Sequence, residues 1–165
     1  MLRKETEVLA DMLDKARQLS LFFISNLKTV DPSKRIVCGD MEFNSIYWLT
    51  AHLIWAEHML VISATGGKIE VPEWLSHYEL GSGGLAHEQP IPYKELLQLM
   101  KDLHIKVLEY IRNFPEEQLD ADNPSGMQFG PDRSNRMMIM HAIRHEGTHG
   151  GHLSWIAKMN GIKLL

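Results

Sequence analysis

Apolar residues recur at steps of three and four along two long stretches of the chain, which is the period of an α-helix that buries one face. These stretches cover about residues 3–27 and 92–114, and the second starts with a proline, which is favoured at the first helical position. A third stretch, about residues 44–64, is apolar on nearly every side. We expect it to form a helix that packs on several faces, with Asp40 or Asn44 supplying the N-cap oxygen.

A fourth helix is predicted over the stretch that contains residues 137–159, with Asp132 or Ser134 as its N-cap. Each of the four helices would have roughly 20–25 residues, and turn-forming residues separate them. This pattern predicts an all-α four-helix bundle. We expect the bundle to be a single domain over residues 1–165, because the length suits one sizeable core.

The connections between the predicted helices give little evidence of strands. Only short pieces near residues 36–37 and 127–129 have a compatible pattern. The long loop between the second and third helices, residues 68–91, holds turn formers, aromatic residues and histidines: Pro72, Trp74, His77, Tyr78, Gly81, Gly83, Gly84, His87 and Pro90. Loops of this length are often functional lids or binding loops, and the alternative is a packed surface crossing held in place by Trp74.

Composition excludes several classes of protein. Hydrophobic residues make up 44% and charged residues 23% of the chain, as in ordinary globular domains, and the net charge of −4 gives no electrostatic reason to expect nucleic acid. Cys38 is the only cysteine, so no internal disulfide is possible, which fits a reducing compartment. No apolar run approaches the roughly 20 residues of a membrane span, and the charged N-terminal stretch lacks a signal-peptide core. We therefore expect a cytoplasmic protein with no membrane partner.

Four histidines lie within twelve residues of the last predicted helix, in a chain with 9 histidines in total. At about 100° per residue, His149 lies about 40° from His145 around the helix, His152 about −20° and His141 about −40°. All four imidazoles therefore share one face. A spacing of four residues also lets two imidazoles reach one metal ion. The alternative is a stripe of polar groups that bind water, backbone or acids.

Residues 145–149 have the sequence HEGTH, which matches the H-E-x-x-H signature of zinc metalloproteases. A catalytic zinc site needs a third protein ligand and an open position. No acidic residue follows Glu146, and the longer metzincin pattern is absent, so a third ligand must lie upstream. His52 is midway along the apolar helix, where a buried imidazole needs partners for both nitrogens. Two helices packed side by side can bring His52 level with His145 and His149.

Three neutral imidazoles suit zinc, nickel, iron or copper. We expect a divalent transition metal, with zinc or nickel ahead of iron and manganese. A zinc protease of the H-E-x-x-H type remains a minor alternative. A di-iron carboxylate bundle would need two Glu-x-x-His pairs, and Glu146 with His149 is the one pair in the chain.

The residues of the second and fourth helices resemble the DinB/YfiT-like superfamily of metal-dependent four-helix bundles. The last helix of that family carries a pattern of the type H-x-x-x-H-R-G-Q, and residues 145–152 read HEGTHGGH. The family also has a histidine in its second helix after an apolar or aromatic stretch, which residues 47–52, YWLTAH, match. The resemblance covers essentially the whole chain and implies that His52, His145 and His149 are the metal ligands. Gly150 and His152 stand where the family usually has Arg and Gln.

The resemblance also implies a class of activity. The family is similar to thiol-dependent transferases and isomerases, including those that use bacillithiol or mycothiol, and its members are often dimers. We therefore expect a homodimeric metal-dependent enzyme that activates water or a low-molecular-weight thiol, for transfer or hydrolysis on a small-molecule substrate. The alternatives are a non-catalytic metal-binding or stress-related module of the same fold, and a structural bundle whose histidines take up metal only during purification.

Three residues beside the predicted ligands are candidate catalytic residues. His141 and His152 flank the ligand pair and would transfer protons or contact substrate; the alternative is a hydrogen-bonded polar stripe beside a wet cleft. Glu146 points about 60–100° away from the ligands. It would orient a ligand imidazole or act as a base, or else form an ion pair with Arg144 or another surface cation.

Overall fold

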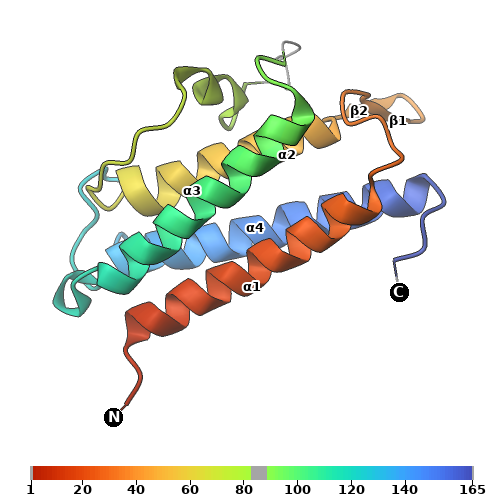
Figure 1. Cartoon of the computed structure of the whole chain (residues 1–165). Coiled ribbons are helices and arrows are strands. Elements are labelled where there is room, and N and C mark those ends of the chain that lie inside the picture. The colour runs from red at the N-terminus through yellow and green to blue at the C-terminus, as the bar shows by residue number, and fades with distance from the viewer. Residues whose placement is uncertain (1, 83–88, 165) are drawn as a thin grey trace.

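The computed structural model describes residues 2–82 and 89–164. It is mostly helical, as the sequence predicts, and is built on four long helices (Figure 1): α1 (Glu5–Asn26), α2 (Ile46–Glu57), α3 (Tyr93–Asn113) and α4 (Asn135–Met159). The shorter elements are two strands, a π-helix and two 3₁₀-helices: β1 (Ile36–Cys38), β2 (Met41–Phe43), η1 (His58–Ser63), η2 (Glu73–Tyr78) and η3 (Glu116–Gln118). The prediction of an all-α four-helix bundle is confirmed.

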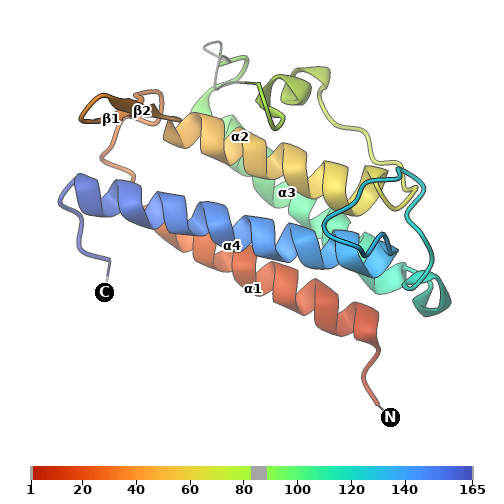
Figure 2. The ribbon, with the colours of Figure 1, turned by 180° about the vertical axis from the view of Figure 1, so that it is seen from behind.

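The four helices form a bundle with two distinct faces. α1 and α4 run in one direction and α2 and α3 in the other, and α1 packs on α3 and α4 while α2 packs on the same two helices. Figure 1 looks onto the side formed by α1 and α3. Figure 2 looks onto the opposite side, formed by α2 and α4. None of the helices in the described residues combines the length and the hydropathy that a membrane crossing requires.

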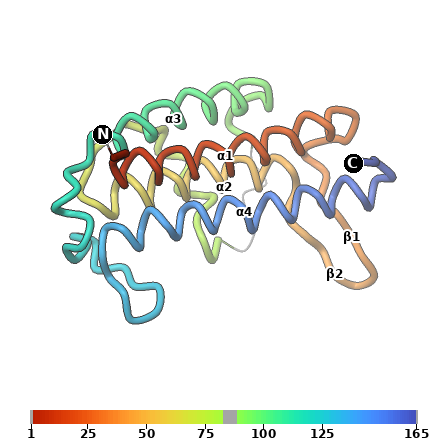
Figure 3. The backbone as a smooth tube through the Cα atoms, turned by 90° about the horizontal axis from the view of Figure 1, so that it is seen from below, coloured from red at the N-terminus to blue at the C-terminus, as the bar shows by residue number. Residues whose placement is uncertain are grey.

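The helix α2 is almost wholly buried in the core, as its largely apolar sequence predicts. Every one of its residues except Trp55 is buried. Its N-cap differs from both residues that the sequence suggested, because Ser45 Oγ accepts the hydrogen bond from the Trp48 amide at 3.1 Å. Asp40 instead belongs to the two-residue turn between β1 and β2, in which Gly39 has a left-handed φ of 60°. Figure 3 shows this hairpin projecting near the C-terminal end of α4.

The predicted helix over residues 44–64 does not continue as an α-helix to its end. After Glu57 it widens into the π-helix η1, in which Leu60, Val61 and Ile62 are all buried. The hydrophobic pattern cannot reveal this change from α-helix to π-helix. Such a change shifts the apolar face around the helix, and a segment that is apolar on all sides has no distinct face. Gly66, with φ of 87°, then ends the helical segment.

The other expectations for the connections have mixed outcomes. Ser134 caps α4, with its hydroxyl accepting from the Met137 amide at 3.1 Å, and the short strand near residues 36–37 is confirmed within β1. The suggested strand at residues 127–129 is wrong. There the side-chain amide of Asn123 donates to the Met127 carbonyl at 2.8 Å. This backbone acceptor is therefore bonded to a side chain and not to the backbone of a neighbouring strand.

The described part of the long connection between α2 and α3 is packed at η2, where Leu75 and Tyr78 are buried. Residues 83–88, which include Gly83, Gly84 and His87, lie outside the described residues. The 3₁₀-helix η2 packs on α2, and the Trp74 ring lies edge-on to Tyr78, with 6.0 Å between ring centroids. The contact of Trp74 agrees with a packed surface crossing, whereas a functional lid or binding loop stays a prediction. Through Tyr78 the segment also reaches the histidine cluster described next.

Candidate metal centre

Three histidines from two helices converge on the side of the bundle formed by α2 and α4. The Nε2 atom of His145 lies 3.2 Å from Nε2 of His52 and 3.2 Å from Nε2 of His149. One ligand atom from each of the three lies within 4.8 Å of the others. The histidines at positions 145 and 149 are one helical turn apart on α4, and the sequence pattern anticipated this juxtaposition with α2.

The spacing of these nitrogens suits a metal ion. With Zn–N bonds of about 2.0–2.1 Å, two nitrogens bound to one tetrahedral zinc ion lie about 3.3 Å apart. The two observed separations of 3.2 Å are close to that value. Three imidazoles with no carboxylate or thiolate form a donor set that suits zinc, nickel, iron or copper.

Two of the three rings have a partner for the nitrogen that faces away from the cluster. Nδ1 of His52 lies 2.6 Å from the carbonyl oxygen of Tyr78 at the end of η2, and Nδ1 of His149 lies 3.1 Å from Nδ1 of His152. A carbonyl only accepts, so Nδ1 of His52 carries the proton and Nε2 presents its lone pair to the cluster. A metal at Nε2 of His149 would likewise place the proton on Nδ1, which then donates to His152.

Aromatic rings fix the orientation of His52. Its ring stacks on Trp48 at 4.6 Å between centroids and on Trp55 at 5.8 Å, with interplanar angles of 15° and 22°. Only 1% of His52 is exposed. Because Trp48 and Trp55 lie four residues before and three residues after His52 on one helical face, the local α2 sequence itself builds this stack.

Burial keeps the three imidazoles neutral. It lowers the pKa of His52, and it lowers the pKa of His145 to about 4 and that of His149 to about 3, with neighbouring histidines adding to both effects. Metals bind the unprotonated ring, so at neutral pH all three rings are in the ligating form.

The candidate residue His141 lies at the edge of the cluster, 6.1 Å from His145 between ring centroids. Its ring stacks on Phe129 with an interplanar angle of 8°, and Arg144 Nη2 lies 2.6 Å from its Nδ1. An arginine only donates, so His141 accepts this bond and keeps its proton on Nε2. Burial lowers the pKa of His141 as well, and the Arg144 charge adds to the shift.

The candidate residue Glu146 has a different environment from the one predicted. It does not pair with Arg144 or any surface cation, because its side chain is buried and its Oε2 lies 3.0 Å from Nη2 of Arg17 on α1. Burial raises the pKa of Glu146, and the Arg17 charge opposes that shift. A carboxylate held in this ion pair is not available as a base at the histidine cluster, which also removes the residue that an H-E-x-x-H protease would use.

A buried polar network, which the sequence reading missed, joins all four helices. Nη2 of Arg17 lies 3.0 Å from carboxylate oxygens of both Glu57 on α2 and Glu146 on α4. Nδ1 of His104 on α3 lies 2.5 Å from Oε1 of Glu57, and its Nε2 lies 3.3 Å from Oδ1 of Asp14. The sequence did contain a signal of this network, because Arg17 falls in register with the buried residues of α1 and Glu57 is the one acidic residue in the largely apolar α2.

Gly150, which stands where the DinB/YfiT-like pattern has Arg, faces α1. A Cβ atom at this position would lie 3.5 Å from Ser20 Oγ and 3.8 Å from the Phe23 ring, so the position accepts a methyl group but not a long side chain. Gly147 and Gly151 have open space where a Cβ would be. Of the three glycines, only Gly150 is at a close helix contact.

Comparison with known proteins identifies a family. A family model described as the DinB superfamily matches residues 12–153, which include His52, His145, His149 and His152. No curated protein and no solved structure matches the chain.

Proposed function

Because the chain belongs to the DinB superfamily, we propose that it is a metal-dependent enzyme whose ion is held by His52, His145 and His149. The single observation that carries this proposal is the convergence of their Nε2 atoms, with 3.2 Å between neighbours. Three imidazoles leave a position for water or substrate on a four-coordinate ion, as catalytic zinc sites require.

The donor set favours a divalent transition metal, zinc or nickel ahead of iron and manganese. Such an ion lowers the pKa of a bound water or thiol, and so supplies a nucleophile at neutral pH. We propose that the protein uses water or a low-molecular-weight thiol in this way, for transfer or hydrolysis on a small electrophilic substrate.

The chain's own residues have separate tasks in this proposal. The Tyr78 carbonyl and His152 set the tautomers of His52 and His149, and Trp48 and Trp55 hold the ring of His52 in place. His152 is exposed and His141 is partly exposed. We propose these two histidines, rather than the buried Glu146, as the groups that exchange protons with a substrate.

The ion-paired state of Glu146 also favours a second candidate function. The carboxylate of Glu146, which follows His145 in the sequence, is held in an ion pair with Arg17. A non-catalytic metal-binding or stress-related module of the same fold would have a metal site without a neighbouring carboxylate base. We propose in either case a cytoplasmic homodimer.

Two measurements on untagged protein test the enzyme proposal. Elemental analysis should find about one transition metal ion per chain, and His145→Ala should remove it while helicity by circular dichroism is retained. His58→Ala is the matched control, because Nε2 of His58 lies 2.9 Å from the Ile69 carbonyl and away from the cluster. A panel of thiols with electrophilic acceptors should then give metal-dependent turnover. Stoichiometric metal with no turnover across the panel would favour the binding module.

A further inference from the structure

A groove of about 620 Å³ lies on the opposite side of the bundle from the histidine cluster. It is formed by the C-terminal half of α1, the turn that follows α1, and the N-terminal half of α3. This is the side that faces the viewer in Figure 1, whereas the histidines of the cluster belong to α2 and α4, which face the viewer in Figure 2. The volume is in the range of pockets that hold small organic molecules.

The walls of the groove are apolar. They are formed by aliphatic and aromatic side chains from both helices and the turn between α1 and β1, among them Leu21, Phe22, Leu27, Val30, Tyr93 and Leu97. Phe22 on this wall is 39% exposed, so part of its apolar surface is open to a ligand. The walls therefore favour an apolar ligand chain or ring.

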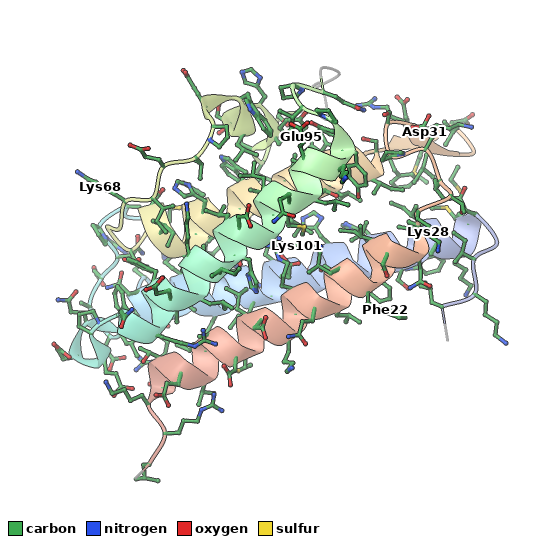
Figure 4. All side chains as sticks on the ribbon, viewed as in Figure 1. Phe22, Lys28, Asp31, Lys68, Glu95 and Lys101 are labelled. Atoms are coloured by element: carbon green, nitrogen blue, oxygen red, sulfur yellow. The ribbon has the colours of Figure 1, made fainter. Side chains whose placement is uncertain are left out.

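Three lysines also line the groove: Lys28 after α1, and Lys94 and Lys101 on α3. Figure 4 shows Lys28 and Lys101, together with Phe22, along the side formed by α1 and α3. In the described part of the chain, no acidic residue lines the groove, and no ion pair involves any of these lysines. Three cations without an ion-pair partner in the described residues thus line an apolar surface.

Acids adjoin two of these lysines in the sequence, Glu95 after Lys94 and Asp102 after Lys101, but adjacent helical residues point about 100° apart and neither acid lines the groove. The helical neighbours of Lys101 at three and four positions are Leu97, Gln98, His104 and Ile105, and those that follow Lys94 are Leu97 and Gln98. The acid nearest to Lys28 in the sequence is Asp31. It accepts a hydrogen bond from the Ser33 amide at 2.9 Å and does not line the groove. The whole chain carries a net charge of −4, so this positive cluster runs against the overall charge.

From these observations we infer that the groove between α1 and α3 binds an amphipathic monocarboxylate of the fatty-acid type. The alkyl chain lies on the apolar walls, and the carboxylate lies among Lys28, Lys94 and Lys101. Burial of the chain provides most of the binding free energy, and the lysines select the charged head group over a neutral one. The flexible ammonium groups suit a head group that is held as a point charge.

A second copy of this chain is a poorer occupant of the same groove. A two-fold symmetric interface presents the same patch from both subunits, so the lysine cluster would face its own copy. Like charges opposed in this way are unfavourable, and the described groove residues include no acid to offset them. The inference is also independent of the proposed metal chemistry, because no histidine of the cluster lines the groove.

Calorimetric titration of the full-length protein with dodecanoate tests the inference, at ligand concentrations below those at which micelles form. We expect saturable binding with one site per chain, and at least tenfold weaker binding of dodecanol, which has the same chain without the charge. The variant with Lys28→Gln, Lys94→Gln and Lys101→Gln should bind dodecanoate about tenfold more weakly and bind dodecanol unchanged.

The matched control changes three lysines that do not line the groove, by Lys34→Gln, Lys106→Gln and Lys163→Gln, and should bind dodecanoate like the wild type. A second variant, Leu97→Asp, places a carboxylate on the wall and should abolish binding while circular dichroism shows a folded protein. The inference is overturned by any of three results: no saturable binding, equal affinity for dodecanoate and dodecanol, or equal losses in the groove and control variants. Sedimentation showing that the groove variant alone changes the oligomeric state would assign this face to a second copy instead.

Discussion

The Nε2 atom of His52 on α2 lies 3.2 Å from the Nε2 atom of His145 on α4, although the two residues are 93 positions apart in the chain. His52 directs a lone pair to this point, because the Tyr78 carbonyl accepts the proton on its other nitrogen. Two nitrogen lone pairs that face each other at this distance repel, unless a proton or a metal ion lies between the two nitrogens. This arrangement is the physical basis of the metal-site proposal.

Arg17→Leu should strongly destabilise the fold. Its guanidinium is the shared partner of Glu57 and Glu146, and removal would leave two carboxylates buried without their cation. We expect the free energy of unfolding in urea to fall by about 3–5 kcal/mol. Arg112→Leu is the control, because its ion pair with Asp11 is exposed and should be worth under about 1 kcal/mol. Equal losses in the two variants would contradict the role given to the buried network.

The metal-free protein should become less stable as the pH falls from about 6.5 toward 4. In the unfolded chain histidines take up protons near pH 6.5, whereas in the folded protein the pKa of His145 is about 4 and that of His149 about 3. The unfolded state therefore binds more protons in this interval, and the free energy of unfolding decreases with falling pH. Urea unfolding at a series of pH values measures this. The double variant His145→Gln with His149→Gln should show a shallower decline, and an identical decline would refute the explanation.

Substitutions of His152 should show whether this residue positions the ring of His149 for metal binding or is only a polar surface residue. His152 is the partner of Nδ1 of His149, so His152→Ala should weaken metal binding by about 10–100-fold, as loss of other such partners does. His152→Gln restores the residue that the DinB/YfiT-like pattern carries there, and should recover most of the affinity. Competition with a chromophoric chelator provides the measurement. Unchanged affinity in His152→Ala would show that the contact has no influence on His149.

Gly150 and Gly151 of α4 should respond differently to substitution. Gly151→Ala fills open space on a helix and should raise the free energy of unfolding by about 0.5–1 kcal/mol. Gly150→Arg, which introduces the family's usual residue, should lower it, because the side chain would have to enter the contact with Ser20 and Phe23 on α1. Thermal unfolding of the two variants beside the wild type distinguishes these effects. Stabilisation by Gly150→Arg would show that α1 can move away at this point.

The histidine cluster could be predicted from the sequence because it depends on the spacing of histidines along two helices. The spacing of His145 and His149 places both on one helix face, and the apolar α2 has His52 at a matching level along the bundle. The partner of His52 could not be predicted, because the Tyr78 carbonyl is a backbone atom that any residue could supply. Its position depends on how η2 packs on α2.

The buried network was not predicted for a different reason. Arg17 stands in the buried register of α1, but charged residues are normally read as exposed, and its two partners lie 40 and 129 residues further along the chain. Which charges meet in the core depends on the order in which the four helices pack. The π-helix after Glu57 was missed because an all-apolar segment has no polar face to show a change of period.

The metal content and coordination of the untagged protein test the account most directly. After growth with added zinc and nickel, elemental analysis of the wild type should give about one ion per chain, and X-ray absorption should show about three imidazole nitrogens at roughly 2.0–2.1 Å. His52→Ala should reduce both the metal content and the number of imidazole nitrogens bound to the metal. Less than about a tenth of an equivalent in the supplemented wild type, or stoichiometric metal retained by His52→Ala with an unchanged absorption spectrum, would contradict the proposed site.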